Sequence, residues 1–192
     1  ITKDINIPCV VICDNGCGMS QSDIENKWLV LGTDSKRRIK DKKSPGGRTL
    51  MGEKGIGRLA VSRLGQQMWM FTKKTNTLWN ILYINWNIFE NPDLFIQDVE
   101  VPVLYGIDEN NFAEAIKKLV YTQKKNLEIE LWKSSRYIDQ RKIIKKQIED
   151  VDMDLELVYD FCDIISKTKN QGTVLFVFNL EDDWEQNLDS KV

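Results

Sequence analysis

The feature that most constrains this chain is a run of apolar residues that ends abruptly at a carboxylate. Val10, Val11 and Ile12 lead, through Cys13, into Asp14-Asn15-Gly16-Cys17-Gly18-Met19. A short apolar run rich in β-branched residues is typical of a buried strand, and open α/β sheets contact ligands at strand ends. The two glycines let the backbone turn sharply and lie close to a flat ligand. The pattern predicts a buried strand with a ligand-binding carboxylate at its end.

A second motif is the glycine-rich stretch Gly52-Glu53-Lys54-Gly55-Ile56-Gly57-Arg58, which opens a helical pattern that ends near Leu64. A glycine-rich loop that runs into a helix N-terminus offers unpaired N–H donors and a positive dipole end to phosphate. Two competing phosphate loops are absent from the sequence, namely GxxxxGK[ST] and GxGxxG in the dinucleotide order. Together, the two motifs predict a site in which one half holds a base and the other its phosphates.

The motifs, in this order, resemble those of the GHKL ATPases, the family of gyrase B, the heat-shock chaperone ATPases, the sensor histidine kinases and MutL. The stretch from Asp14 to Met19 resembles their DxGxG adenine box, and Gly52 to Gly57 resembles their GxxGxG lid and phosphate box. Gly172-Thr173 resembles the Gly-Thr pair that precedes a late strand. Gly32-Thr33-Asp34-Ser35-Lys36 and the GEKGIGR box are similar to a poorly characterised prokaryotic subset and, more distantly, to the MORC proteins.

The resemblance implies a two-layer α/β sandwich with a mixed sheet and helices on one face. It also implies an ATP-binding domain in which ATP binding, with ADP as the product state and Mg²⁺ as cofactor, closes a lid and switches a partner or a homodimer. The dimer contacts would lie in segments outside this chain, and the protein client is not indicated.

The resemblance also assigns roles to residues. Asp14 is expected to accept a hydrogen bond from the adenine amino group, directly and through water, whereas it would repel O6 of guanine. Met19 would supply a polarizable apolar wall beside the ring, and Thr173 would complete the adenine contacts. The residues expected to contact the nucleotide are Asp14, Asn15, Gly16, Gly18, Met19, Lys36, Gly52, Lys54, Gly55, Ile56, Gly57, Arg58 and Thr173.

Catalysis is not assigned. In the family an earlier helix carries a Glu that polarises the attacking water and an Asn that holds magnesium, and nothing in residues 1–9 matches it. We therefore expect an N-terminally truncated domain that lacks the general base and the metal-binding Asn. Two alternatives to an ATPase stay open: a nucleotide-dependent interaction module without turnover, and a histidine-kinase catalytic domain. The chain contains no histidine, so a phosphoacceptor would have to lie elsewhere.

Composition narrows the function classes. A chain of 192 residues that is 42% hydrophobic and 29% charged fits one ordinary globular domain. Its net charge of −2 gives no electrostatic argument for binding nucleic acid or an anionic membrane. Because the sequence has neither a signal-peptide pattern nor roughly 18 continuous apolar residues, we expect a cytoplasmic protein. Its cysteines, Cys9, Cys13, Cys17 and Cys162, are interpreted as small reduced core residues rather than as disulfides or metal ligands.

The segment after the adenine box is expected to hold a short helix and then the ATP lid. Ser22 and Glu25 fit a capping box, and apolar residues at helical spacing follow up to Gly32. Residues 33–51 lack periodicity and are rich in lysine and arginine. By position they resemble the lid, whose cations, Lys36 first, would approach the phosphates; the alternative is a solvated basic loop. Aromatic residues are missing from this run, so it gives no support to nucleic-acid binding.

The remaining sequence predicts a hairpin, a helical region and a final strand. Pro102 indicates an edge strand or a strand end. Residues 110–170 are interpreted as a helical insertion without chemistry. The expected elements are strands at 67–72 and 78–86 joined by a turn at 73–77, a strand at 95–103, a helix at 110–125, a short strand or extended link at 127–132, a helix at 134–150 and a strand at 172–178.

Overall fold

The computed structural model describes residues 8–29, 61–151 and 153–181. Five strands form one sheet in the order β1-β5-β2-β3-β4, and every pairing among these described strands is antiparallel. The strands are β1 (Cys9–Asp14), β2 (Gly65–Lys73), β3 (Trp79–Asn85), β4 (Val103–Ile107) and β5 (Gly172–Leu180). The α-helices are α1 (Gln21–Asp23), α2 (Phe112–Asn126), α3 (Ile138–Asp150) and α4 (Leu155–Thr168).

Short helical turns connect these elements. Element η1 (Ile24–Trp28) continues α1 as a π-helix. The 3-10 turns are η4 (Trp86–Glu90), η5 (Ile96–Asp98), η6 (Glu109–Asn111) and η7 (Glu130–Lys133). None of the helices in the described residues has the length and hydropathy needed to cross a membrane.

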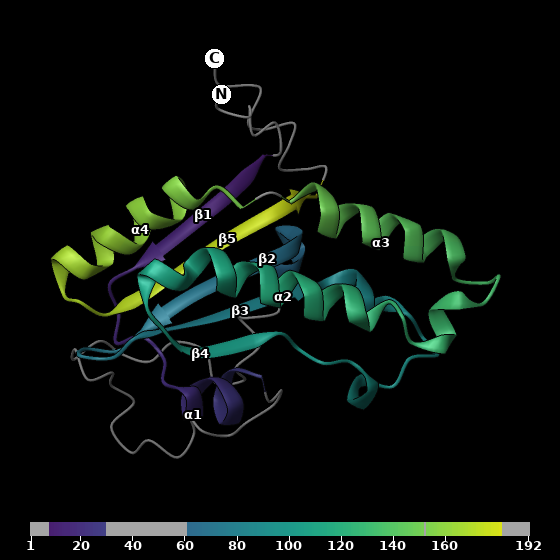
Figure 1. Cartoon of the computed structure of the whole chain (residues 1–192), viewed down its shortest axis with the longest axis horizontal. Coiled ribbons are helices and arrows are strands. Elements are labelled where there is room, and N and C mark those ends of the chain that lie inside the picture. Colours follow the sequence, from purple (N-terminus) through teal and green to yellow (C-terminus); the bar gives the residue numbers. More distant parts are fainter. Residues whose placement is uncertain (1–7, 30–60, 152, 182–192) are drawn as a thin grey trace.

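One face of the sheet carries the larger core beneath α2 and α4 (Figure 1). Alternate residues of the strands point to this face, and Trp69 of β2 stacks on Tyr83 of β3 with ring centroids 4.1 Å apart. Phe112 of α2 and Cys162 of α4 are fully buried in the same cluster. Because amphipathic helices must bury their apolar side, α2 and α4 close this face.

The opposite face has its own, smaller core. Met70 of β2, Leu82 of β3 and Val177 of β5 are buried there, and Ile24 of η1 covers them. Met19 packs at the margin of this cluster as a partly buried side chain. The segment of Met19 and η1 therefore lies on the face opposite α2 and α4.

Many sequence predictions are confirmed. The α/β class is confirmed, as are the hairpin of β2 and β3, the helices α2 and α3, and the final strand β5. The sheet was predicted to be mixed, but its described pairings are all antiparallel. Residues 110–170 are helical as predicted, with the helices α2, α3 and α4, and side chains of two of them, α2 and α4, belong to the larger core.

Four local predictions are wrong. β1 is an edge strand paired only with β5 among the described strands, and Ile12 is 40% exposed, so β1 is not buried. The strand expected at 95–103 is replaced by η5, and β4 begins only after Pro102. The link at 127–132 ends in the helical turn η7. The capping box is formed by Ser20 and Asp23, and the helix that it opens spans only residues 21–28 through α1 and η1.

Candidate functional site

A row of polar side chains crosses the sheet at the end of β1. Asp14 on β1 is paired with Thr173 on β5, Thr173 with Thr72 on β2, and Thr72 with Asn80 on β3. Residues directly opposite each other across strands project from the same face. Further along that face the side chains are apolar, such as Met70 and Leu82. A carboxylate, two hydroxyls and an amide are thus gathered at one end of an apolar sheet face.

The turn after β1 holds the Asp14 carboxylate. The backbone N–H of Gly16 donates to Asp14 Oδ1 over 2.7 Å. A Cβ atom at position 16 would stand only 2.6 Å from that same oxygen, so a larger residue there would push the carboxylate out of this orientation. Asp14 is exposed, and no donor in the described part of the chain reaches its second carboxylate oxygen, Oδ2. One oxygen orients the carboxylate, and the other can accept a hydrogen bond from a ligand.

Two more glycines bring the turn after β1 onto the sheet. Gly18 has φ +60°, and a Cβ there would lie 1.8 Å from the carbonyl oxygen of Lys73 at the end of β2. Gly172 has φ +150°, and a Cβ there would lie 2.2 Å from the carbonyl oxygen of Asp14. The loop therefore packs backbone against backbone on both β2 and β5.

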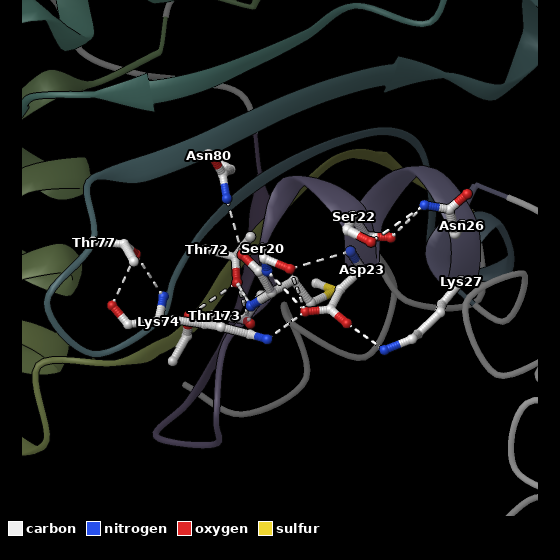
Figure 2. A network of polar contacts seen from close by, with 12 residues as sticks. Ser20, Ser22, Asp23, Asn26, Lys27, Thr72, Lys74, Thr77, Asn80 and Thr173 are labelled. Atoms are coloured by element: carbon white, nitrogen blue, oxygen red, sulfur yellow. Dashed lines mark hydrogen bonds and ion pairs between the residues drawn. The ribbon is translucent and has the colours of Figure 1, made fainter.

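Side chains of the central strands bind the backbone of Met19. Its N–H donates to Thr72 Oγ1 over 3.0 Å, and its carbonyl accepts from Asn80 Nδ2 over 2.9 Å (Figure 2). Asn80 Oδ1 in turn accepts from the N–H of Gly106 on β4 over 3.2 Å. Both polar groups of the Met19 backbone are satisfied, which fixes the place of its side chain beside the sheet.

Thr72 is the centre of this network. Its hydroxyl is fully buried and donates to the carbonyl oxygen of Gly172 over 3.1 Å. The same oxygen lies 3.0 Å from Thr173 Oγ1. Thr72 thereby joins the turn after β1 to Gly172 and Thr173, two segments that are distant in the sequence.

The start of α1 is bound to the β2–β3 hairpin by ionic contacts. Ser20 N donates to Asp23 Oδ2 over 3.0 Å, and Lys74 Nζ lies 2.5 Å from that oxygen. Lys27 contacts the other oxygen of Asp23, so Figure 2 shows this carboxylate between two ammonium groups. Burial alone would raise the pKa of Asp23, but hydrogen bonds from Lys27, Lys74 and Ser20 outweigh it and hold the pKa well below its usual range.

The structure brings together part of the residue set predicted from the sequence. Asp14, Asn15, Gly16, Gly18 and Met19 form one continuous turn, with Thr173 beside it. The lid at 33–51 and the remaining predicted contacts lie outside the described residues: Lys36, Gly52, Lys54, Gly55, Ile56, Gly57 and Arg58.

Sequence reasoning missed Thr72, Asn80, Asp23 and Lys74. One signal could have found the first two, because Thr72 and Asn80 are polar residues at the turn-side ends of the apolar runs 68–71 and 81–84. Their partners depend on strand register, which the sequence pattern does not give.

The four cysteines differ in their exposure to solvent. All four are free thiols; Cys162 is buried and Cys9 half-buried, whereas Cys13 and Cys17 are exposed, so the core interpretation is wrong for the last two. Burial raises the pKa of the Cys9 thiol. Among the described residues, no group of three His, Cys, Asp or Glu side chains could hold a metal ion.

Comparison with known proteins places the chain in a family. A family model described as "Histidine kinase-, DNA gyrase B-, and HSP90-like ATPase" matches residues 3–102, which is more than half of the 192 residues. No curated protein matches the chain. The matched range contains the turn after Asp14 and the strands that carry Thr72 and Asn80. The chain therefore belongs to the GHKL family of histidine kinase-, DNA gyrase B- and HSP90-like ATPases, as a GHKL-type ATPase domain.

Proposed function

We propose that this domain binds ATP with the adenine ring at the end of β1, against the polar row of Asp14 and Thr173. The observation that carries the proposal is the Asp14 carboxylate. It is oriented by the Gly16 N–H, and its second oxygen has no donor in the described residues. In a GHKL-type domain such a carboxylate is suited to the exocyclic amino group of adenine, which is a hydrogen-bond donor.

The surroundings of Asp14 suit a flat base. Gly16 and Gly18 carry no side chain, and a Cβ at position 16 would fill the space beside the carboxylate. Ile12 lies on the same face of β1 as Asp14 and is 40% exposed, and Met19 is partly buried nearby. These apolar groups offer contacts to a ring whose edge Asp14 would recognise.

For the phosphates, the proposal relies on sequence. Backbone N–H groups of Gly52, Gly55, Ile56 and Gly57 would donate to phosphate oxygens, with added charge from Lys54 and Arg58. Mg²⁺ would accompany the phosphates, as is usual for nucleotide sites. Among the described residues, no group of three His, Cys, Asp or Glu side chains could hold this ion.

We further propose that ATP binding closes residues 33–51 as a lid, with Lys36 toward the phosphates, and that closure switches a partner or a dimer. The support is the position of this basic run between the adenine box and the glycine-rich box. Limited trypsin digestion tests it. An ATP analogue with magnesium should protect sites between Arg37 and Arg48, while cleavage within 134–150 should be unaffected. Equal cleavage with and without nucleotide would contradict the lid.

The base preference tests the site itself. Calorimetric titration of the wild-type domain with ATP and with GTP should give clearly tighter binding of ATP, because O6 of guanine would face the Asp14 carboxylate. A single charge-assisted hydrogen bond contributes about 1.5–3 kcal/mol. Equal affinity for the two nucleotides would contradict the adenine assignment. Steady-state hydrolysis of ATP by the same sample would separate an ATPase from a nucleotide-dependent module without turnover.

A further inference from the structure

Three contacts constrain the direction of each hydrogen bond made by the Thr72 hydroxyl. A hydroxyl carries one proton and two acceptor lone pairs. One lone pair receives the N–H of Met19, at 3.0 Å. The proton goes to the carbonyl oxygen of Gly172, at 3.1 Å, because a carbonyl can only accept. For all three contacts to be hydrogen bonds at the same time, the contact to Thr173 Oγ1 at 3.0 Å has to use the second lone pair of Thr72.

This arrangement determines the direction in which the Thr173 hydroxyl donates its proton. Since Thr72 can only accept in their mutual contact, the Thr173 hydroxyl donates to Thr72 and points its proton into the sheet. Thr173 is buried and has no other partner in the described part of the chain, so its lone pairs are what it can present to a ligand. Asp14, its neighbour across the strands, is likewise an acceptor.

We propose that Thr72 is a specificity-determining residue, which acts by holding Thr173 as an acceptor so that Asp14 and Thr173 together present only acceptors to the base. This proposal rests on the ATP-binding function proposed above. The chemistry that fits two neighbouring acceptors is a primary amino group on a purine, which offers two N–H donors. A keto oxygen at the same place would meet two acceptors and find no proton.

A bridging water does not change this result. A water that donates one proton to Asp14 and the other to Thr173 has only lone pairs left toward the ligand. The ligand must then supply the donor, as an amino group does. Direct and water-mediated contacts therefore select the same group. Thr72 Oγ1 also accepts from the Met19 N–H. The same oxygen therefore holds the loop in place and keeps the Thr173 hydroxyl as an acceptor toward the ligand.

The test compares Thr72→Val with Thr72→Ser, using ATP and inosine triphosphate (ITP) as probes in calorimetric titrations of the whole domain. Valine keeps the shape of threonine but removes the oxygen, which frees the Thr173 proton to donate to O6 of inosine. We expect weaker ATP binding, tighter ITP binding and an ATP-to-ITP affinity ratio that falls about tenfold, the scale of one hydrogen bond. Thr72→Ser retains the hydroxyl and should keep the wild-type ratio.

A purely structural role for Thr72 would weaken both nucleotides equally, and that result, or an unchanged ratio in Thr72→Val, would overturn the proposal. A gain for ITP cannot arise from damage to the fold. If Thr72→Val does not fold, nuclear magnetic resonance of the ligand-free wild-type protein decides. A scalar coupling from the Thr72 hydroxyl proton to the Gly172 carbonyl carbon supports the proposal, and a coupling-free proton directed at Thr173 contradicts it. Failure of the wild type to bind ATP would instead refute the proposed function. The two failures can be told apart, because the measurement on the Thr72 hydroxyl needs no ligand.

Discussion

At the scale of single residues, the site depends on where backbone atoms can approach each other. Gly18 and Gly106 share a positive φ, +60° and +66°. They differ in surroundings, because a Cβ at Gly18 would collide with the Lys73 carbonyl at 1.8 Å, whereas a Cβ at Gly106 would meet nothing within 4 Å. Replacing each glycine in turn therefore separates two free-energy costs: that of an unfavourable φ, and that of losing the contact between loop and sheet.

Alanine substitution at these glycines should give clearly different results. Gly106→Ala should lower the free energy of unfolding by about 1–2 kcal/mol, the cost of the left-handed conformation. Gly18→Ala should cost more, and it should also weaken ATP binding, because the loop has to leave β2. Urea unfolding followed by circular dichroism, together with ATP titration, measures both effects. Equal destabilisation by the two substitutions would contradict the close packing of Gly18.

Asp23 gives the structure a pH-dependent contact. Its carboxylate binds Lys74, Lys27 and Ser20, and these contacts lower its pKa in the folded state. A group with a depressed folded pKa adds stability above its unfolded pKa, about 3.9, and loses that contribution as the pH falls toward the folded pKa. Asp23→Asn should therefore be less stable than the wild type at pH 7, and the difference should shrink below about pH 4.

Urea unfolding across that pH range tests the Asp23 contact. Asp160→Asn is the matched control, because Asp160 is exposed on α4 and has no partner among the described residues. The control should follow the wild type at every pH. A constant difference between Asp23→Asn and the wild type down to pH 2 would show that the ion pairs do not stabilise the fold.

At the scale of elements, α3 is bound to the sheet by a network of amides. Gln147 Oε1 accepts from Asn85 Nδ2 over 3.3 Å and from Asn87 Nδ2 over 3.1 Å. The backbone carbonyl of Gln147 accepts from Gln67 Nε2 over 3.0 Å, and Gln67 Oε1 in turn accepts from the hydroxyl of Tyr83. Burial raises the pKa of Tyr83, so this hydroxyl stays protonated as the donor.

Replacing Gln147 by leucine should loosen α3. The change keeps a similar volume but removes an acceptor from two side-chain amides, one of them fully buried. The expected loss is about 1–3 kcal/mol of unfolding free energy, with faster amide hydrogen exchange in α3. Lys146→Leu, at an exposed neighbouring position, should change stability by no more than about 0.5 kcal/mol. A Gln147→Leu protein as stable as the control would contradict the role of the network.

The sequence predicted those elements whose pattern is local. The apolar runs of β3 and β5 identify strands whatever their neighbours, and the stripe of α2 identifies a helix. The position of β1 at the sheet edge is not local, because it depends on which strand pairs with it. The capping box was predicted two residues late because Ser20-x-x-Asp23 and Ser22-x-x-Glu25 both fit the pattern. In the structure Ser20 and Asp23 make the reciprocal cap hydrogen bonds, and Asp23 also pairs with Lys74 of the hairpin.

The candidate site was likewise predictable only in part. Asp14, Gly16 and Gly18 form a compact sequence motif, and Thr173 belongs to a short dipeptide motif. Thr72 and Asn80 belong to no motif, since their function comes from register with distant strands. Their polarity at strand ends was visible, but their partners were not.

At the scale of the whole molecule, the two faces of the sheet have different tasks. The face beneath α2 and α4 holds the aromatic core, while the other face combines a smaller core with the polar row. Substitutions confined to the first face should alter stability, and those in the polar row should alter ligand binding. The central claim is that this second face binds ATP through Asp14.

The most direct measurement is a calorimetric titration of ATP into the wild-type domain and into Asp14→Asn, with Asp160→Asn as control. Asparagine keeps the size of the side chain but replaces the charged acceptor, so binding should weaken by about 1.5–3 kcal/mol, or roughly tenfold to a hundredfold. The control should bind as tightly as the wild type, and circular dichroism should show the same fold for all three. ATP binding by the wild type that Asp14→Asn leaves unchanged would contradict the account.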